Sequence, residues 1–178
     1  MRACALRRRR HYAVQSEDTP LARLSDLTER DRAHLLRLRE QAPRFEQTPW
    51  VSGGLLSQRR IAIVTTAALH QRNDSAFDSG AGATDYRVLP DATPAAELVM
   101  SHLSVNFDRT GFQQDLNVVF PIDRLHELAA DAVIGSTAAF HYSFMGAPWP
   151  PTRFEARARE LAALLHADGV DGVMLTPV

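Results

Sequence analysis

Residues 115–128, which read DLNVVFPIDRLHEL, decide how this chain folds. The β-branched pair Val118–Val119 predicts a short strand that ends at Phe120–Pro121. A helix is expected next, because proline is tolerated in the first helical turn and apolar residues follow at three-residue spacing. Those residues are Ile122, Leu125 and Leu128. The stretch therefore predicts a strand, a sharp turn and a helix, which is the kind of corner at which α/β folds bind ligands.

Length and composition indicate one globular domain with an uneven distribution of charge. The 178 residues are 45% hydrophobic and 23% charged, with a net charge of −1. Residues 1–60 carry thirteen Arg against seven acidic residues, and residues 61–178 carry seven Arg against fourteen. The single cysteine, Cys4, excludes an internal disulfide framework. No apolar run reaches membrane-spanning length, so we expect a cytoplasmic protein with no membrane partner.

The N-terminal part of the chain differs from the remainder. We expect residues 1–57 to form a disordered basic tail and a helical N-terminal extension, with a helix over Leu24–Gln41 that ends before Pro43. Residues 58–178 are expected to form the main α/β domain. The run Arg7–Arg10 could contact nucleic acid or an acidic partner. Because no aromatic residues interleave with these arginines, a nucleic-acid partner is not expected.

Strand and helix patterns alternate through the second part of the chain. The apolar run Arg60–Thr66 predicts a strand buried on both faces, and Thr152–Glu155 predicts a capping box before a helix that reaches about His166. This helix is expected to stop at Gly169 and to turn four residues inward: Phe154, Ala158, Leu161 and Leu165. Further strands are expected at Tyr86–Leu89, Glu97–His102, within Val133–Gly146 and, buried, at Gly172–Val178. This order predicts an α/β fold with a mostly parallel sheet and crossover helices, in a Rossmann-like or flavodoxin-like three-layer arrangement. Gly80–Gly82 follows no strand, so a dinucleotide site is not predicted there.

Several motifs occur in an order that resembles a known enzyme family. They are Ile61–His70, Tyr86–Pro90, Ser101–His102, Asp115–Leu125, Tyr142–Gly146 and Gly169–Asp171. Together they resemble the selenoprotein B family of glycine, sarcosine, betaine and D-proline reductases, over about residues 48–178. The block Phe120–Leu125 is the most specific of these motifs.

The resemblance implies an oxidoreductase subunit that reductively cleaves a small amino acid or amine at its α-carbon. In this family a selenocysteine or cysteine attacks that carbon, and a pyruvoyl group on a partner subunit can hold the substrate amine. Other reductase subunits and a thioredoxin-like dithiol donor are the implied partners. The family's U-x-x-C or C-x-x-C motif follows the strand that here reads Val173–Val178.

The nucleophile is therefore expected just after Val178, and the α/β domain is expected to be incomplete at its C-terminus. We hypothesise that a UGA selenocysteine codon was read as a stop. If so, the 1–178 form alone should be inactive. The alternative is a non-catalytic α/β module that binds a ligand or partner and derives from the same family.

Candidate site residues lie at or near the predicted strand ends. His102 is the candidate catalytic acid or base, although it could instead satisfy a backbone carbonyl. The candidate substrate-binding residues are His70, Asp108, Asp115, Asn117, Asp123 and Arg124. Asp115 and Asn117 could instead tie down the preceding loop, and Arg124 could form a surface ion pair rather than bind a carboxylate. The His and Asp spacing fits no recognised metal-ligand pattern, so no metal is expected.

Overall fold

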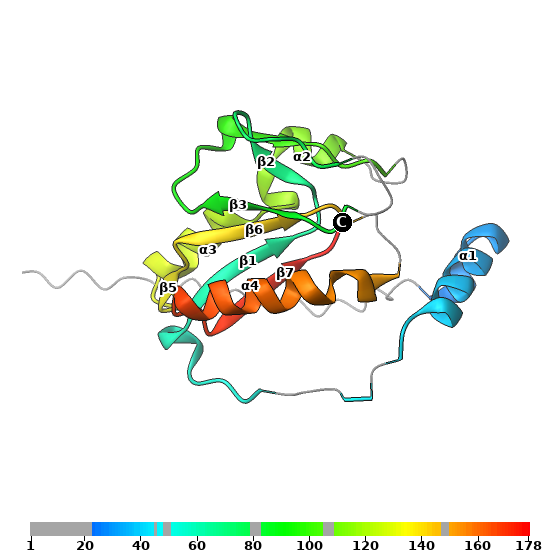
Figure 1. The fold of residues 1–178 in the computed structure, drawn as a ribbon, viewed down its shortest axis with the longest axis horizontal. Coiled ribbons are helices and arrows are strands. Elements are labelled where there is room, and N and C mark those ends of the chain that lie inside the picture. Colours follow the sequence, from blue (N-terminus) through cyan, green and yellow to red (C-terminus); the bar gives the residue numbers. More distant parts are fainter. Residues whose placement is uncertain (1–22, 45, 48–50, 79–82, 105–108, 147–149) are drawn as a thin grey trace, which may run out of the picture. The chain divides into compact units, whose positions relative to one another are not determined.

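Strand β1 (Arg60–Thr65) lies inside the main sheet because most of its side chains are buried. Ile61, Ala62 and Ile63 are at most 8% exposed. The computed structural model in Figure 1 describes residues 23–44, 46–47, 51–78, 83–104, 109–146 and 150–178. The chain divides into two compact units, Met1–Gln41 and Ala42–Val178. The basic tail at residues 1–20, the Gly80–Gly82 segment and Asp108 lie outside the described residues.

The main sheet is built around β1. Strands β5 (Ser136–Thr137), β6 (Phe140–Phe144) and β7 (Gly172–Thr176) all pair with β1 in parallel. β5 pairs with the beginning of β1 and β6 with its end, whereas β7 follows β1 from Ile61 to Thr65. β3 (Tyr86–Pro90) pairs with β6 in the antiparallel direction. These pairings confirm the predicted α/β fold with a mostly parallel sheet.

A second, smaller sheet follows the end of β1. β2 (Leu69–Gln71) and β4 (Leu98–Met100) pair in the antiparallel direction. The predicted strand at Glu97–His102 is therefore shorter than expected, because the 3₁₀ helix η3 (Ala95–Glu97) precedes it and Ser101 follows its end. Ala68, with a φ of 52°, lies between β1 and β2.

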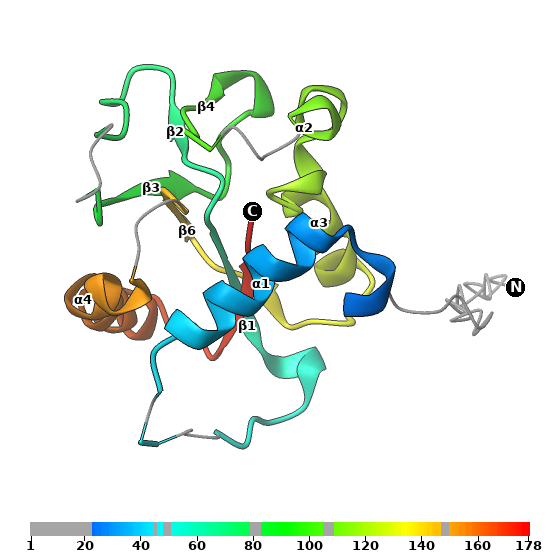
Figure 2. The same ribbon diagram turned by 90° about the vertical axis from the view of Figure 1, so that its right-hand side faces the viewer.

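The two longer helices of the second unit pack on opposite faces of the sheet. In Figure 2, α3 (Ile122–Ala130) and α4 (Glu155–Ala167) lie on either side of β1 and β6. Ile122 and Leu125 of α3 pack in a cluster that includes Ile63. Leu161 of α4 packs in a second cluster with aromatic residues of β6. Helices thus cover both faces of the sheet. The more specific expectation of a Rossmann-like or flavodoxin-like three-layer arrangement stays a prediction.

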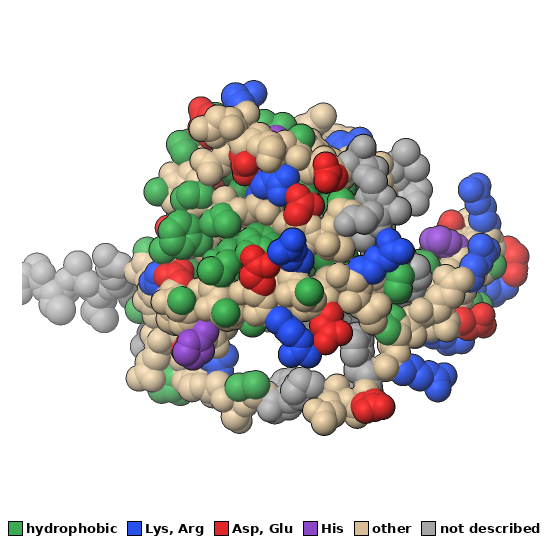
Figure 3. All heavy atoms as spheres, viewed as in Figure 1, with side chains coloured by type: hydrophobic (Ala, Val, Ile, Leu, Met, Phe, Trp, Pro, Cys, Tyr) green, Lys and Arg blue, Asp and Glu red, His purple; other side chains and the backbone are tan. Residues whose placement is uncertain are grey.

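The outward face of α4 is charged. Arg157 forms an ion pair with Glu160 at 2.7 Å, and Arg159 forms one with Glu155 at 2.8 Å. Figure 3 shows acidic and basic side chains next to one another over this helix. Such exposed pairs contribute little stability, so the apolar face holds α4 in place.

Two predictions for helix ends are wrong. Thr152 and Glu155 do not form a capping box: Pro151–Phe154 form the 3₁₀ helix η5, and α4 has Phe154 at its N-cap without a side-chain cap. The proline run favours this tight turn, since its fixed φ angles suit a helix start. The N-terminal helix also begins later than expected. After η1 (Leu24–Asp26), α1 (Glu29–Gln41) begins behind Thr28, whose hydroxyl accepts a hydrogen bond from the Asp31 amide at 3.2 Å.

Both α3 and α4 end in the same backbone arrangement. At the end of α4, the amides of Gly169 and Val170 donate back to carbonyls of the last turn, and Gly169 has a φ of 68°. At the end of α3, Ala132 occupies the equivalent position with a φ of 56°. The predicted stop at Gly169 is confirmed. A left-handed alanine is strained, because its Cβ approaches the following carbonyl.

Exchanging the residues at these two positions should have opposite effects. Gly169→Ala is expected to lower the free energy of unfolding by about 1 kcal/mol, and Ala132→Gly to raise it by a similar amount. A Cβ at Gly169 would meet only Arg60 Cδ at 3.9 Å, so steric overlap adds nothing to the backbone effect. Urea unfolding of the two variants measures this, and shifts of the same sign would contradict it.

Candidate functional site

The carboxyl ends of β1 and β7 meet at one edge of the main sheet. The hydroxyls of Thr65 and Thr176 both donate to the carbonyl oxygen of Val119, at 2.9 and 3.1 Å. The Val178 amide donates to the hydroxyl of Thr66 at 2.8 Å. In Figures 1 and 2 the C-terminal end of the chain lies below β2 and α2 (Thr110–Gln114). The segment before α3 is thus hydrogen-bonded to the carboxyl edge of the sheet, which is where α/β folds usually bind ligands.

The predicted strand at Val118–Val119 is wrong. Leu116–Val118 form the 3₁₀ helix η4, and the Asp115 carboxylate accepts the Asn117 amide at 2.9 Å across its first turn. Such a local side-chain bond competes with strand pairing and favours a turn. Pro121 then stands at the N-cap of α3, so the sharp turn before a helix is as predicted.

Asp115, Asn117 and Asp123 form one hydrogen-bonded cluster at the start of α3. The Asn117 side-chain amide donates to both carboxylates at 2.9 Å, and its oxygen accepts the Asp123 backbone amide at 3.1 Å. The bonds from Asn117 lower the pKa of Asp115. The cluster binds the η4 turn to α3 and presents two carboxylates at the surface.

Arg124 lies beside this cluster on the next position of α3. Its guanidinium forms an ion pair with Glu127 at 2.7 Å, and its side chain is 60% exposed. An exposed pair of this kind contributes little to stability, so it leaves Arg124 able to exchange partners with an anionic ligand.

His102 lies just after the end of β4. It is 5% exposed, and its Nδ1 accepts the Ser104 amide at 3.1 Å. Its carbonyl accepts a short hydrogen bond from Arg109, which precedes α2. Burial, followed by the positive charge of Arg109, lowers the pKa of His102. His102 is thus a neutral imidazole that carries its proton on Nε2.

Two neighbouring oxygen atoms fix the ring of His70. Its ring nitrogens lie 2.8 Å from the Gln71 carbonyl oxygen and 2.8 Å from the Ser101 hydroxyl. The sequence placed Ser101 at a strand end but did not pair it with His70. Among the described residues, no group of three His, Cys, Asp or Glu side chains is placed to hold a metal ion.

Asp91, His126 and His141 form a cluster that the sequence did not predict. His141 is fully buried in β6, and its Nδ1 accepts the Ile63 amide of β1 at 2.9 Å. Its Nε2 must therefore carry the proton that it donates to Asp91, at 2.9 Å. His126 of α3 approaches the same carboxylate oxygen at 3.0 Å. The available signal in the sequence was a histidine between two aromatic residues of a predicted strand, Phe140 and Tyr142.

This cluster has shifted proton affinities. Burial lowers the pKa of His141 more than the neighbouring Asp91 raises it. Burial would raise the pKa of Asp91, but its hydrogen bonds with His141 and His126 outweigh that effect and lower it. The buried imidazole is thus neutral and the carboxylate is charged near neutral pH.

Stability is expected to fall as the pH drops below the ordinary histidine pKa of 6.5, because the pKa values of both His102 and His141 are lowered in the fold. Below that pH the unfolded chain binds protons that the folded chain does not, so the loss stops only at the folded-state pKa values. Urea unfolding at about pH 7.5 and about pH 5.5 measures the effect. Equal free energies at the two pH values would contradict it.

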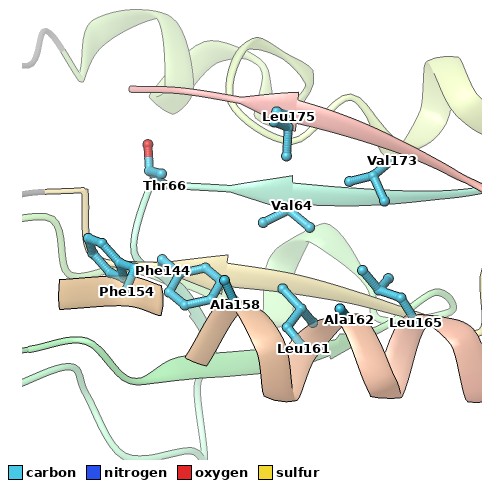
Figure 4. A pocket seen from close by; sticks show the side chains of 10 residues that line it. All are labelled: Val64, Thr66, Phe144, Phe154, Ala158, Leu161, Ala162, Leu165, Val173 and Leu175. Atoms are coloured by element: carbon cyan, nitrogen blue, oxygen red, sulfur yellow. The ribbon is translucent and has the colours of Figure 1, made fainter. Parts of the chain in front are cut away.

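An apolar groove lies between α4 and the sheet. It has a volume of about 400 Å³, and Figure 4 shows its side chains arriving from α4, β1, β6 and β7. The predicted inward residues Phe154, Ala158, Leu161 and Leu165 all line it. The prediction that β7 is buried is wrong, since Val173, Met174 and Leu175 are 43%, 37% and 70% exposed. Among the described strands β7 pairs only with β1, which leaves its other edge uncovered.

Comparisons with known proteins show which family the chain is similar to. Residues 43–178 match the glycine/sarcosine/betaine reductase selenoprotein B family. The chain is 33% identical over 122 residues to the D-proline reductase subunit gamma of Acetoanaerobium sticklandii, covering 68% of this chain and 49% of that protein. It is 29% identical over 124 residues to the betaine reductase complex component B subunit beta of Peptoclostridium acidaminophilum, covering 68% of this chain and 28% of that protein.

A third relative is the glycine reductase complex component B subunit gamma of Symbiobacterium thermophilum, 28% identical over 123 residues, which are 68% of this chain and 29% of that protein. The chain thus spans about half the length of the first relative and under a third of the other two. No solved structure matches it. In the described part of the chain, no helix is both long and apolar enough to cross a membrane. Because the family match extends over most of its length, the chain belongs to the glycine/sarcosine/betaine reductase selenoprotein B family.

Proposed function

We propose that this chain is a component of a selenol- or thiol-dependent reductase that cleaves a small amino acid or amine at its α-carbon. The observation that carries this proposal is the family match over residues 43–178. The relatives are named as subunits of D-proline, betaine and glycine reductases, so we infer that this chain also works with other reductase subunits.

The proposed substrate site is the carboxyl edge of the sheet. An amino acid has one charged group of each sign, and this edge offers partners for both. Exposed Asp115 and Asp123 suit an ammonium group, and Arg124 suits a carboxylate through its planar fork. His102, whose buried ring is neutral with its proton on Nε2, is the proposed acid or base of the reaction. His70 and Asp108 complete the proposed set of binding residues.

The nucleophile of the proposed reaction is not among the matched residues. Residues 43–178 contain no cysteine, and Cys4 precedes them. We propose that a selenocysteine or cysteine outside residues 1–178 reaches the carboxyl edge. A pyruvoyl group on a partner subunit would supply the carbonyl that holds a substrate amine. A thioredoxin-like dithiol would return the oxidised chalcogen to its reduced form.

The test compares the 1–178 chain with a form that continues through the downstream reading frame, each combined with the other reductase subunits and a dithiol donor. We expect dithiol-dependent consumption of glycine, sarcosine, betaine or D-proline only in the complex that contains the longer form, because residues 43–178 contain no cysteine. Alkylation of that complex should abolish turnover. Turnover by the isolated 1–178 chain, or no turnover with the longer form, would contradict the proposal.

A second candidate is a non-catalytic α/β module that binds a ligand or partner. The absence of cysteine from residues 43–178 favours it. This candidate predicts that a small amino acid binds at the carboxyl edge while the complex turns over equally well without the chain. The DNA after codon 178 provides a separate test. An open frame that encodes a cysteine-containing segment supports the reductase subunit, and a frame without one supports the module.

A further inference from the structure

The two edge strands of the main sheet, β3 and β7, differ in how they are protected. On β3, the Arg87 guanidinium donates to the carbonyl oxygens of Ser75 and Ala76 at 2.9 and 3.0 Å, which ties a loop to that strand. β3 also ends in Pro90, which has no amide hydrogen to offer another strand. Charged side chains, proline and covering loops are the usual devices that keep an edge strand from pairing with another chain.

β7 has none of these devices. Its sequence, GVMLT, contains no charged residue and no proline, and in the described part of the chain it pairs with β1 alone. Val173 and Leu175 line the apolar groove beside α4, as Figure 4 shows, so Met174 points to the opposite face of the sheet. All three side chains are exposed. An apolar, unprotected edge of this kind is a template for pairing with a further strand.

The pairing with β1 determines which backbone groups of β7 point outward. The Thr176 carbonyl accepts the Thr66 amide at 3.2 Å, so Thr176 directs its backbone groups toward β1. Every second residue of a strand directs these groups to the same side. Val173 and Leu175 therefore present their amides and carbonyls at the outer edge of the sheet.

These outward groups are complementary to the same edge of a second copy. If two β7 strands run antiparallel about a two-fold axis at Met174, Val173 lies opposite Leu175 of the second copy, and Leu175 lies opposite its Val173. Each of these pairs exchanges two hydrogen bonds, so every outward amide and carbonyl finds a partner. On the face that carries α4, the same pairs join the two apolar grooves and remove exposed apolar surface from water.

We propose that two copies of this chain associate through their β7 strands, which joins the two main sheets into one. A second copy fits this edge because the strand is complementary to itself in hydrogen bonding and in apolar side chains. No like charges meet across the axis, since β7 carries none. The inference does not depend on the proposed reaction, and its experiments need no turnover.

Sedimentation velocity of the 1–178 chain over a range of concentrations tests the association. We expect a reversible species with twice the chain mass of 19.8 kDa. Met174→Lys and Met174→Glu each place two like charges opposite one another, and each should weaken the dimer about 10-fold or more. An equal mixture of the two variants should restore it. Val88→Lys is the matched control, because Val88 is 38% exposed on β3 and Met174 is 37% exposed on β7, and it should leave the dimer unchanged.

Disulfide formation tests the position of the axis. In this register Met174 forms a non-hydrogen-bonded pair with its own copy, and the Cα atoms of such a pair lie about 4.5 Å apart, which a disulfide can span. In a Cys4→Ser background, which removes the one native cysteine, Met174→Cys should give a covalent dimer under mild oxidation. Val88→Cys in the same background should stay monomeric on a denaturing gel.

A chain that stays monomeric at every concentration would overturn the proposal. So would a dimer that neither Met174→Lys nor Met174→Glu weakens, or one in which Met174→Cys forms no more disulfide than Val88→Cys. Circular dichroism shows whether the charged variants fold. If they do not, the disulfide result decides alone, because cysteine is a small, uncharged replacement at an exposed position.

Discussion

His141→Ala is expected to lower the free energy of unfolding by about 3 kcal/mol. The fully buried ring accepts the Ile63 amide at 2.9 Å, between the points where β5 and β6 pair with β1. Without the ring, that buried amide has no acceptor in the strand ladder, and Asp91 loses a hydrogen-bond donor. The lost volume beside Phe120, whose ring centroid lies 5.5 Å from that of His141, adds to the cost.

Urea or guanidinium unfolding of His141→Ala measures this effect. His166→Ala is the matched control, because His166 is an exposed histidine in the last turn of α4, and its change should stay within about 0.5 kcal/mol. His141→Asn should recover part of the loss, since its side-chain oxygen can accept the Ile63 amide. A loss below about 1 kcal/mol for His141→Ala would show that the side chain does not hold β1 to β6.

Thr65→Val is expected to lower the free energy of unfolding by about 2 kcal/mol. The fully buried Thr65 hydroxyl donates to Val119 at 2.9 Å and accepts the Ala67 amide at 3.2 Å. Valine has nearly the same shape, so the change removes both hydrogen bonds and leaves the packing largely intact. The buried Ala67 amide loses its acceptor, which is the main cost.

Thr176→Val provides the comparison. Thr176 donates to the same Val119 oxygen at 3.1 Å, so Thr65 still satisfies that carbonyl when Thr176 is changed. The single Thr176→Val variant should therefore lose less than about 1 kcal/mol. The double variant should lose more than the sum, because Val119 then has neither donor. Strict additivity, measured by urea unfolding, would contradict a shared role for the two hydroxyls.

The His141 change is expected to lower the free energy of unfolding more than the Thr65 change, because the two substitutions remove different hydrogen bonds. Removal of the His141 side chain leaves a backbone amide of the central strand β1 without its acceptor. Removal of the Thr65 hydroxyl weakens mainly the connection between the carboxyl edge and the turn before α3. The first change should reduce stability throughout the second unit. The second should act mainly on the proposed substrate site, which the Val119 link connects to the sheet.

Secondary structure was predictable from sequence where apolar periodicity was strong. β1, α3 and α4 follow from runs of apolar residues at strand or helix spacing. The η4 turn was not predictable in this way. Val118 and Val119 favour a strand, but the Asp115 side chain bonds to the Asn117 amide and the two threonines hold the Val119 carbonyl. Local and tertiary hydrogen bonds outweigh a weak strand propensity.

The exposure of β7 also depended on tertiary structure. An apolar strand is buried only if neighbouring elements cover it, and in the described residues β7 pairs on one side alone. The hydrogen bonds between site residues could not be predicted from the sequence either, because they join segments that are distant in sequence. His70 and Ser101 are 31 residues apart, and Ile63 and His141 are 78 apart.

By itself, the sequence determined the α/β class, the mostly parallel sheet and the family, because apolar spacing and ordered motifs are properties of the chain alone. Tertiary structure alone decided which polar side chains meet. It brought Asp115, Asn117 and Asp123 into one cluster, and it placed Ser101 against His70. The physical reason is that a side-chain hydrogen bond depends on distances of about 3 Å, which only the packed fold defines.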